Sequence, residues 1–104
     1  MVEVHLERWD PSDGTLTERR MMSLMEREGY EVAVYAYREG TEFSPHEHSQ
    51  DKCDAVLQGV LRVTVGAENY DLGPGDRLYL PAGTRHSARV LGVQTVLSLD
   101  GTRW

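Results

Sequence analysis

The sequence predicts an all-β domain of the sandwich or barrel type, with one short helix near the N-terminus. From residue 30 onward, the chain is a series of short runs rich in β-branched and aromatic residues. Glycine and proline separate these runs at regular intervals, as at Gly59, Gly66 and the Gly-Pro-Gly turn at 73–75. Many short strands divided by such turns are typical of all-β sandwiches and barrels. The chain has 104 residues, so we expect a single domain over 1–104.

The helix is predicted by a change of hydrophobic period after residue 14. Thr15 and Glu18 form the T-x-x-E pattern of a capping box. Apolar residues then follow at roughly helical spacing, and Gly29 is well placed to end the segment. We therefore expect one helix over about 16–28, packed against the outside of a sheet.

The strands are predicted by alternation and by apolar runs. Val2, Val4 and Leu6 alternate with polar residues, which predicts a half-buried first strand that could be exchanged in a homodimer. Further strands are expected at 30–37, 54–58, 60–65, 69–72, 77–80, 86–91 and 93–99.

Composition and charge restrict the partners and the compartment. The 17 acidic and 11 basic residues give a net charge of −6, which should repel a phosphate backbone, so nucleic acid is not an expected partner. No apolar run is long enough to cross a membrane, and the acidic N-terminus does not resemble a signal peptide. Cys53 is the single cysteine, which favours a reducing compartment. These features predict a cytoplasmic protein.

Three of the four histidines are candidates for a metal site. His46 and His48 are separated by one residue, so on a strand both would point to the same face. Two imidazoles side by side fill a core poorly, since each brings a polar nitrogen that needs a partner. His86 follows a tight Pro-Ala-Gly turn that could direct it toward the other two.

The spacing around these histidines resembles the two motifs of the cupin superfamily over about residues 40–90. The matching positions are Gly40, His46, His48 and Gly59 in the first motif, and Gly75, Pro81, Gly83 and His86 in the second. The resemblance implies an antiparallel jelly-roll β-barrel. It also implies one divalent ion, of iron, manganese, nickel, copper or zinc, on His46, His48 and His86, and a homodimer.

One position departs from the family pattern. Where cupins usually carry a glutamate ligand, this sequence has Lys52 or, counted differently, Cys53. An ammonium about 5 Å from a divalent ion would be repelled by roughly 7 kcal/mol at an effective dielectric of 20. Three outcomes stay open: Lys52 turns away and is neutralised by Asp51 or Asp54, a bulge turns Cys53 toward the ion, or the metal is weak or absent.

The sequence leaves two classes of function open. The first is a metal-dependent enzyme on a small organic molecule, a three-histidine dioxygenase or an isomerase, with Lys52, Cys53 and Asp54 as catalytic candidates. The second is a non-catalytic cupin that binds or senses a small ligand with weak metal binding or none. Aromatic residues on or beside predicted strands could line the pocket or pack in the core or a dimer interface; the candidates for substrate binding are Tyr37, Phe43 and Tyr79.

Overall fold

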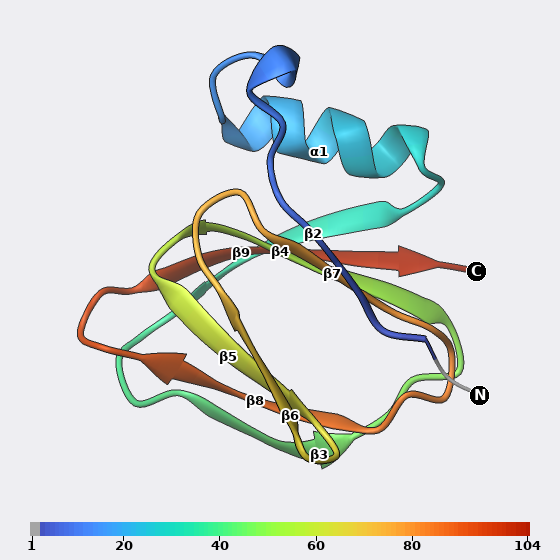
Figure 1. Ribbon diagram of the computed structural model, residues 1–104, viewed down its shortest axis with the longest axis vertical. Helices are drawn as coiled ribbons and strands as arrows, with labels where there is room; N and C mark the ends of the chain where they lie inside the picture. Colours follow the sequence, from blue (N-terminus) through green and yellow to red (C-terminus); the bar gives the residue numbers. More distant parts are fainter. Residues whose placement is uncertain (1–2) are drawn as a thin grey trace.

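Two antiparallel sheets that face each other make up most of the protein, and one helix covers the outer face of the larger sheet (Figure 1). The computed structural model describes residues 3–104. The five-stranded sheet has the order β1 (His5–Glu7), β7 (Arg77–Leu80), β4 (Asp51–Gln58), β9 (Val96–Arg103) and β2 (Glu31–Tyr37). The four-stranded sheet has the order β3 (Glu42–His46), β8 (His86–Leu91), β5 (Val60–Val65) and β6 (Glu68–Leu72).

The alternation of side chains along β4 and β9 divides the interior into two parts. Cys53, Ala55 and Leu99 are fully buried on the face beneath the helix, where they pack with Met21 and Met25. The residues between them face the other sheet, and there Val56 and Val96 join the core between the two sheets. The five-stranded sheet is therefore covered on both faces.

The helix α1 spans Glu18–Arg27, inside the predicted 16–28, but its cap differs from the prediction. The Thr17 hydroxyl, rather than that of Thr15, accepts a hydrogen bond from the backbone N–H of Arg20 at 3.1 Å. Thr15 contributes only its carbonyl, which accepts from the Arg20 guanidinium at 2.9 Å. Gly29 follows the helix at a φ of +94°, as its predicted role at the end of the helix requires.

The strands agree with the prediction in the middle of the chain and differ from it at several boundaries. β4 begins at Asp51, three residues before the predicted 54–58, and β9 extends to Arg103, beyond the predicted 93–99. The strand β3 was not among the predicted strands. A Cβ on Gly59, at the β4–β5 turn, would lie 3.0 Å from the Thr95 carbonyl, which explains the motif glycine.

The structure also bears on two further predictions, the exchanged N-terminal strand and the closed barrel. Val2 lies outside the described residues, while β1 pairs antiparallel with β7 of the same chain, with Leu6 opposite Leu78. The backbone ladders form two sheets, which hydrogen bonding does not close into one barrel within residues 3–104. Along the same residues, none of the helices is long and apolar enough to span a bilayer.

Candidate metal centre

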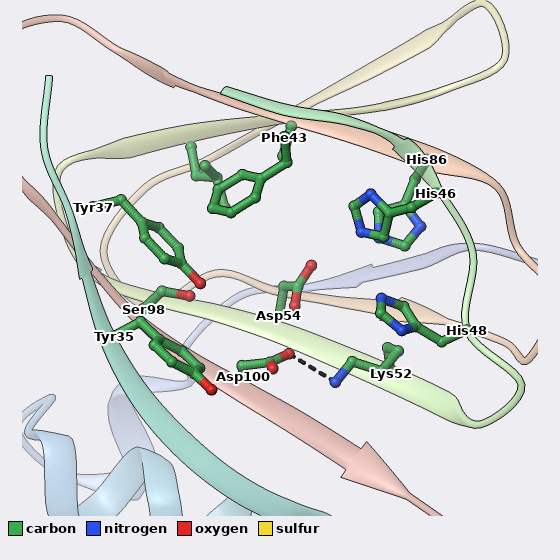
Figure 2. A pocket seen from close by; sticks show the side chains of 12 residues that line it. Tyr35, Tyr37, Phe43, His46, His48, Lys52, Asp54, His86, Ser98 and Asp100 are labelled. Carbon is green, nitrogen blue, oxygen red and sulfur yellow. Dashed lines mark ion pairs between the residues drawn. The ribbon is translucent and has the colours of Figure 1, made fainter. Parts of the chain in front are cut away.

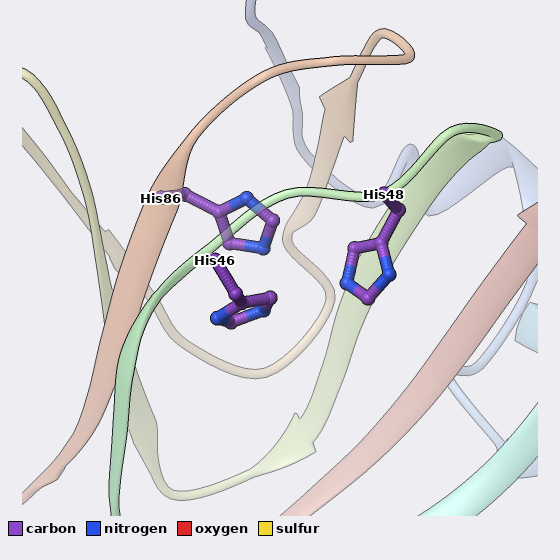
Figure 3. A group of neighbouring side chains, drawn as sticks. All are labelled: His46, His48 and His86. Atoms are coloured by element: carbon purple, nitrogen blue, oxygen red, sulfur yellow. The ribbon is translucent and has the colours of Figure 1, made fainter.

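Three histidines come together at one end of the space between the sheets (Figure 3). His46 ends β3 and His86 begins β8, and the two are directly opposite in the antiparallel ladder. His48 comes after the end of β3, in the loop that leads to β4. The expectation of two histidines on one strand is therefore correct for His46 only. The His48 carbonyl accepts a hydrogen bond from the N–H of Gly83 at 2.8 Å, which ties this loop to the turn before His86.

The geometry of the cluster suits a metal ion. One candidate ligand atom from each ring lies within 4.8 Å of the other two. Nitrogens bound to one ion at about 2.1 Å lie about 3–3.5 Å apart, so atoms up to 4.8 Å apart need to close by at most about 1.3–1.8 Å. Nδ1 of His46 lies 2.6 Å from the Ser44 carbonyl, and Nδ1 of His86 lies 2.9 Å from the Thr84 carbonyl. A carbonyl can only accept, so each Nδ1 carries the proton and each Nε2 keeps its lone pair for an ion.

Electrostatics also favour the neutral forms of His48 and His86. Burial, followed by the charge of Lys52, lowers the pKa of His48. Burial is also the main cause of the lowered pKa of His86, and it outweighs the opposing hydrogen bond to Thr84. Neutral imidazole is the form that binds metal ions, so the two histidines are in the required form at neutral pH.

The cluster opens into a cavity of about 430 Å³ between the two sheets (Figure 2). The cavity is large enough for a small organic molecule. The lining combines an aromatic and apolar part with a polar part that includes the histidines; the residues are Tyr35, Tyr37, Phe43, His46, His48, Lys52, Asp54, Leu61, His86, Ala88, Ser98 and Asp100.

Comparison with known proteins identifies the family. The family model described as "Cupin domain" matches residues 33–100, which is more than half of the chain. The chain belongs to the cupin family. It is also 38% identical over 55 residues to Uncharacterized protein SCO3923 of Streptomyces coelicolor. That match covers 53% of this chain and 52% of the relative, so the chain spans about half the length of the curated relative.

Solved structures similar to this cupin support the fold. A cupin superfamily protein from Desulfitobacterium hafniense matches 97% of this chain and 77% of its own, with a TM-score of 0.65 and 20% identity. KdgF from Halomonas sp. matches 97% of this chain and 81% of its own, with a TM-score of 0.63 and 19% identity. The DMSP lyase DddQ from Ruegeria pomeroyi matches 73% of this chain and 39% of its own, with a TM-score of 0.65 and 23% identity. At these identities, the likeness concerns the fold alone.

Lys52, at the position of the usual cupin glutamate, stays in the cavity wall with its charge compensated. Its side chain lies in the cavity lining and the residue is only 8% exposed. Its ammonium group pairs with the Asp100 carboxylate at 2.9 Å and donates to the Thr102 hydroxyl at 2.6 Å. The predicted neutralisation by Asp51 or Asp54 is wrong, because the ion pair forms with Asp100. Asp51 instead pairs with Arg103 at 3.1 Å.

Asp54 lies in the cavity beside this ion pair. It is directly opposite Asp100 in the β4–β9 ladder and two residues from Lys52, so all three side chains share one face of the sheet. Burial raises the pKa of Asp54 to about 7, and the nearby charge of Asp100 adds to the rise against the opposing effect of Lys52. In the view of Figure 2, Asp54 points into the cavity between the aromatic side chains and the imidazoles.

Two predicted candidates lie on the opposite face of the sheet. Cys53 is fully buried beneath the helix, in the cluster that contains Met21 and Met25, so the bulge that would turn it toward the histidines is not present. Burial raises the pKa of its thiol, which makes it a poor ligand. Tyr79 packs against the same cluster and donates to the Glu28 carboxylate at 2.6 Å. Neither residue lines the cavity.

The other two aromatic candidates do line the cavity. Tyr37 and Phe43 pack edge to face, with ring centroids 4.9 Å apart. Sequence reasoning missed Asp100, the partner of Lys52, because the predicted last strand ended at residue 99. Had that strand been extended, the polar residues Ser98, Asp100 and Thr102, at every second position, would have indicated a polar face.

Proposed function

We propose that this cupin binds one divalent metal ion on His46, His48 and His86, and acts on a small organic molecule held in the adjoining cavity. The observation that carries the proposal is the meeting of the three imidazoles at the wall of a cavity of about 430 Å³. The Nδ1 atoms of His46 and His86 donate hydrogen bonds to backbone carbonyls, which leaves their Nε2 atoms available as ligands.

Different parts of the cavity would bind different parts of the ligand. A bound ion would supply Lewis acidity, which polarises an oxygen of the ligand. The aromatic pair of Tyr37 and Phe43, together with Leu61, offers apolar surface for the carbon skeleton. Because Asp100 compensates the charge of Lys52, the ammonium adds much less repulsion toward a cation than an unpaired lysine would.

Metal content of the untagged protein is the direct test of the site. The protein would be purified without chelator, loaded with iron, manganese, nickel, copper or zinc in turn, and measured by plasma mass spectrometry. We expect near-stoichiometric metal in the wild type and at least a ten-fold weaker affinity in His86→Ala, because one of three protein ligands is lost.

His5→Ala is the matched control for this experiment. His5 is the one remaining histidine and lies at the surface, where its ring is 2.6 Å from the Glu7 carboxylate. Its removal should leave the stoichiometry unchanged. Equal metal binding by wild type and His86→Ala would contradict the three-histidine site.

A second candidate function is a ligand-binding cupin that needs no metal. The presence of Lys52 where the family usually has a glutamate ligand favours it, since the site has lost a negative charge. If no metal binds at any loading but small carboxylic acids raise the thermal midpoint, this second function replaces the first.

A further inference from the structure

We propose that Asp54 is the proton-transfer group of this site, that Lys52 and Asp100 position it, and that the substrate is a small carbonyl compound with a C–H bond next to the carbonyl. The inference deepens the proposed function and depends on it for the histidine-bound ion. It selects proton-transfer chemistry, such as isomerisation, over dioxygenase chemistry.

The pairing pattern of three side chains is the first support. Lys52 and Asp54 are neighbours on the cavity face of β4, and Asp54 is opposite Asp100 on β9. The Lys52 ammonium forms its ion pair with Asp100 at 2.9 Å and a further hydrogen bond with Thr102. Within residues 3–104, Asp54 forms no ion pair of its own. Both carboxylates line the cavity, but the cation holds that of Asp100.

The protonation of Asp54 is the second support. Two carboxyl groups side by side do not both ionise readily, and the one without a cation retains its proton to higher pH. Burial and the Asp100 charge raise the pKa of Asp54 to about 7, so both of its forms are present near neutral pH. A general acid or base works best with such a pKa. The other titratable groups that line the same cavity are Tyr35, Tyr37, His46, His48, Lys52, His86 and Asp100.

The layout of the cavity defines the substrate class. The imidazoles and the aromatic pair of Tyr37 and Phe43 both line the cavity, and Asp54 lies between them in Figure 2. A carbonyl oxygen directed toward the histidines therefore places the carbon skeleton against the aromatic rings. The carbon atom next to the carbonyl then lies near Asp54.

The reaction balances without an oxidant or a reductant. The Asp54 carboxylate takes the proton from the carbon next to the carbonyl, and the electron pair of the broken C–H bond forms a C=C bond. The electrons of the carbonyl π bond move to the oxygen, which carries the negative charge of the enolate. Asp54, now protonated, returns the proton to carbon, either at the same face or at a neighbouring carbon when the product is an isomer.

Carboxyl NMR of the metal-free protein tests the proton-transfer group independently of the ion. In protein labelled with ¹³C-aspartate, we expect one aspartate signal with a midpoint between pH 6 and 8. The signal should be absent in Asp54→Asn and present in Asp71→Asn, whose carboxylate pairs with Arg62 away from the cavity. Lys52→Met should move the midpoint upward, because a stabilising cation is lost. A wild type with no such signal would overturn the proposal.

Deuterium exchange of pyruvate and phenylpyruvate tests the substrate class. The protein loaded with metal would be placed in D₂O with each compound, and loss of the proton signal next to the carbonyl followed by NMR. We expect exchange to be about 10²–10⁴-fold slower in Asp54→Asn than in the wild type, at equal metal content. Equal rates would overturn the role of Asp54, and no exchange of either compound by the metal-loaded wild type would overturn the carbonyl class. Failure to bind metal would instead refute the proposed function, while the carboxyl titration would stand.

Discussion

The two faces of the β4–β9 strand pair carry out different tasks, although they are built from alternate residues of the same segments. On the face that packs against the helix (the helix face), Cys53, Ala55 and Leu99 are fully buried beside Met21 and Met25. On the face toward the other sheet (the cavity face), the residues next to them in sequence include Asp54 and Asp100, which line the cavity. A single residue step along either strand therefore exchanges an apolar core for a polar site.

The two faces contribute to the free energy of folding with opposite signs. Burial of apolar side chains on the helix face stabilises the fold in proportion to the area removed from water. Burial of carboxylates and an ammonium on the cavity face costs free energy, which their mutual pairing offsets only in part. We infer that the helix face stabilises the sheet and so allows the polar groups of the cavity to be held in place.

The largest expected effect is the loss of a core side chain on the helix face. Leu99 is 0% exposed, and Leu99→Ala should lower the free energy of unfolding by about 2–5 kcal/mol because it leaves a cavity among packed neighbours. Urea unfolding measures this loss. The folded fraction should still bind metal, since the histidines lie on the other side of the sheet.

Ser98→Ala is the control from the neighbouring position on the cavity face. Ser98 is 2% exposed and lines the cavity. Its loss should cost no more than about 1.5 kcal/mol, the contribution of a typical hydrogen bond. If Ser98→Ala destabilised the protein as much as Leu99→Ala, the two faces would contribute equally to stability.

The next effect is pH-dependent and belongs to the cavity face. The pKa of Asp54 is raised from 3.8 to about 7 on folding, so its protonated form stabilises the fold fully below pH 3.8, and this contribution is lost as the pH rises through 7. Asp54→Asn removes the dependence. The variant should therefore gain stability relative to the wild type between pH 5 and pH 8, by about 1–2 kcal/mol after allowance for solvent at the cavity.

Urea unfolding at the two pH values measures this gain, with Asp71→Asn as the control. Arg62 holds the pKa of Asp71 below its usual value, so the control has no reason to gain stability at higher pH. If the free energy of unfolding of Asp54→Asn and of the wild type changed equally between pH 5 and 8, the ionisation of Asp54 would not destabilise the fold.

The sequence was informative where the pattern is local. The period of two, the turn glycines and the spacing of His46, His48 and His86 predicted the sheets and the cluster, because each depends on residues close together in the chain or on a family motif. The phase of a strand was harder to predict. Tyr79 alternates with the buried Leu78 and Leu80, and only the packing shows that the two leucines face the other sheet while Tyr79 packs on the helix side.

The partner of Lys52 could not be predicted for a different reason. Asp100 is distant from Lys52 in sequence and becomes its partner through the register of β4 against β9, where Asp54 is opposite Asp100. The partners that the sequence suggested, Asp51 and Asp54, are both within two residues of Lys52. Long-range register is set by the whole sheet, so no local pattern around residue 52 contains it.

The smallest effect distinguishes the observed helix cap from the predicted one. The Thr17 hydroxyl accepts from the N–H of Arg20, and Thr17→Ala should cost about 1 kcal/mol in urea unfolding. Thr15→Ala keeps the backbone carbonyl that accepts from the Arg20 guanidinium, so its cost should be close to zero. Both variants should retain full metal content, because the helix covers the face of the sheet opposite the histidines. A larger cost for Thr15→Ala than for Thr17→Ala would instead restore the capping box that the sequence predicted, and would place the start of the helix two residues earlier.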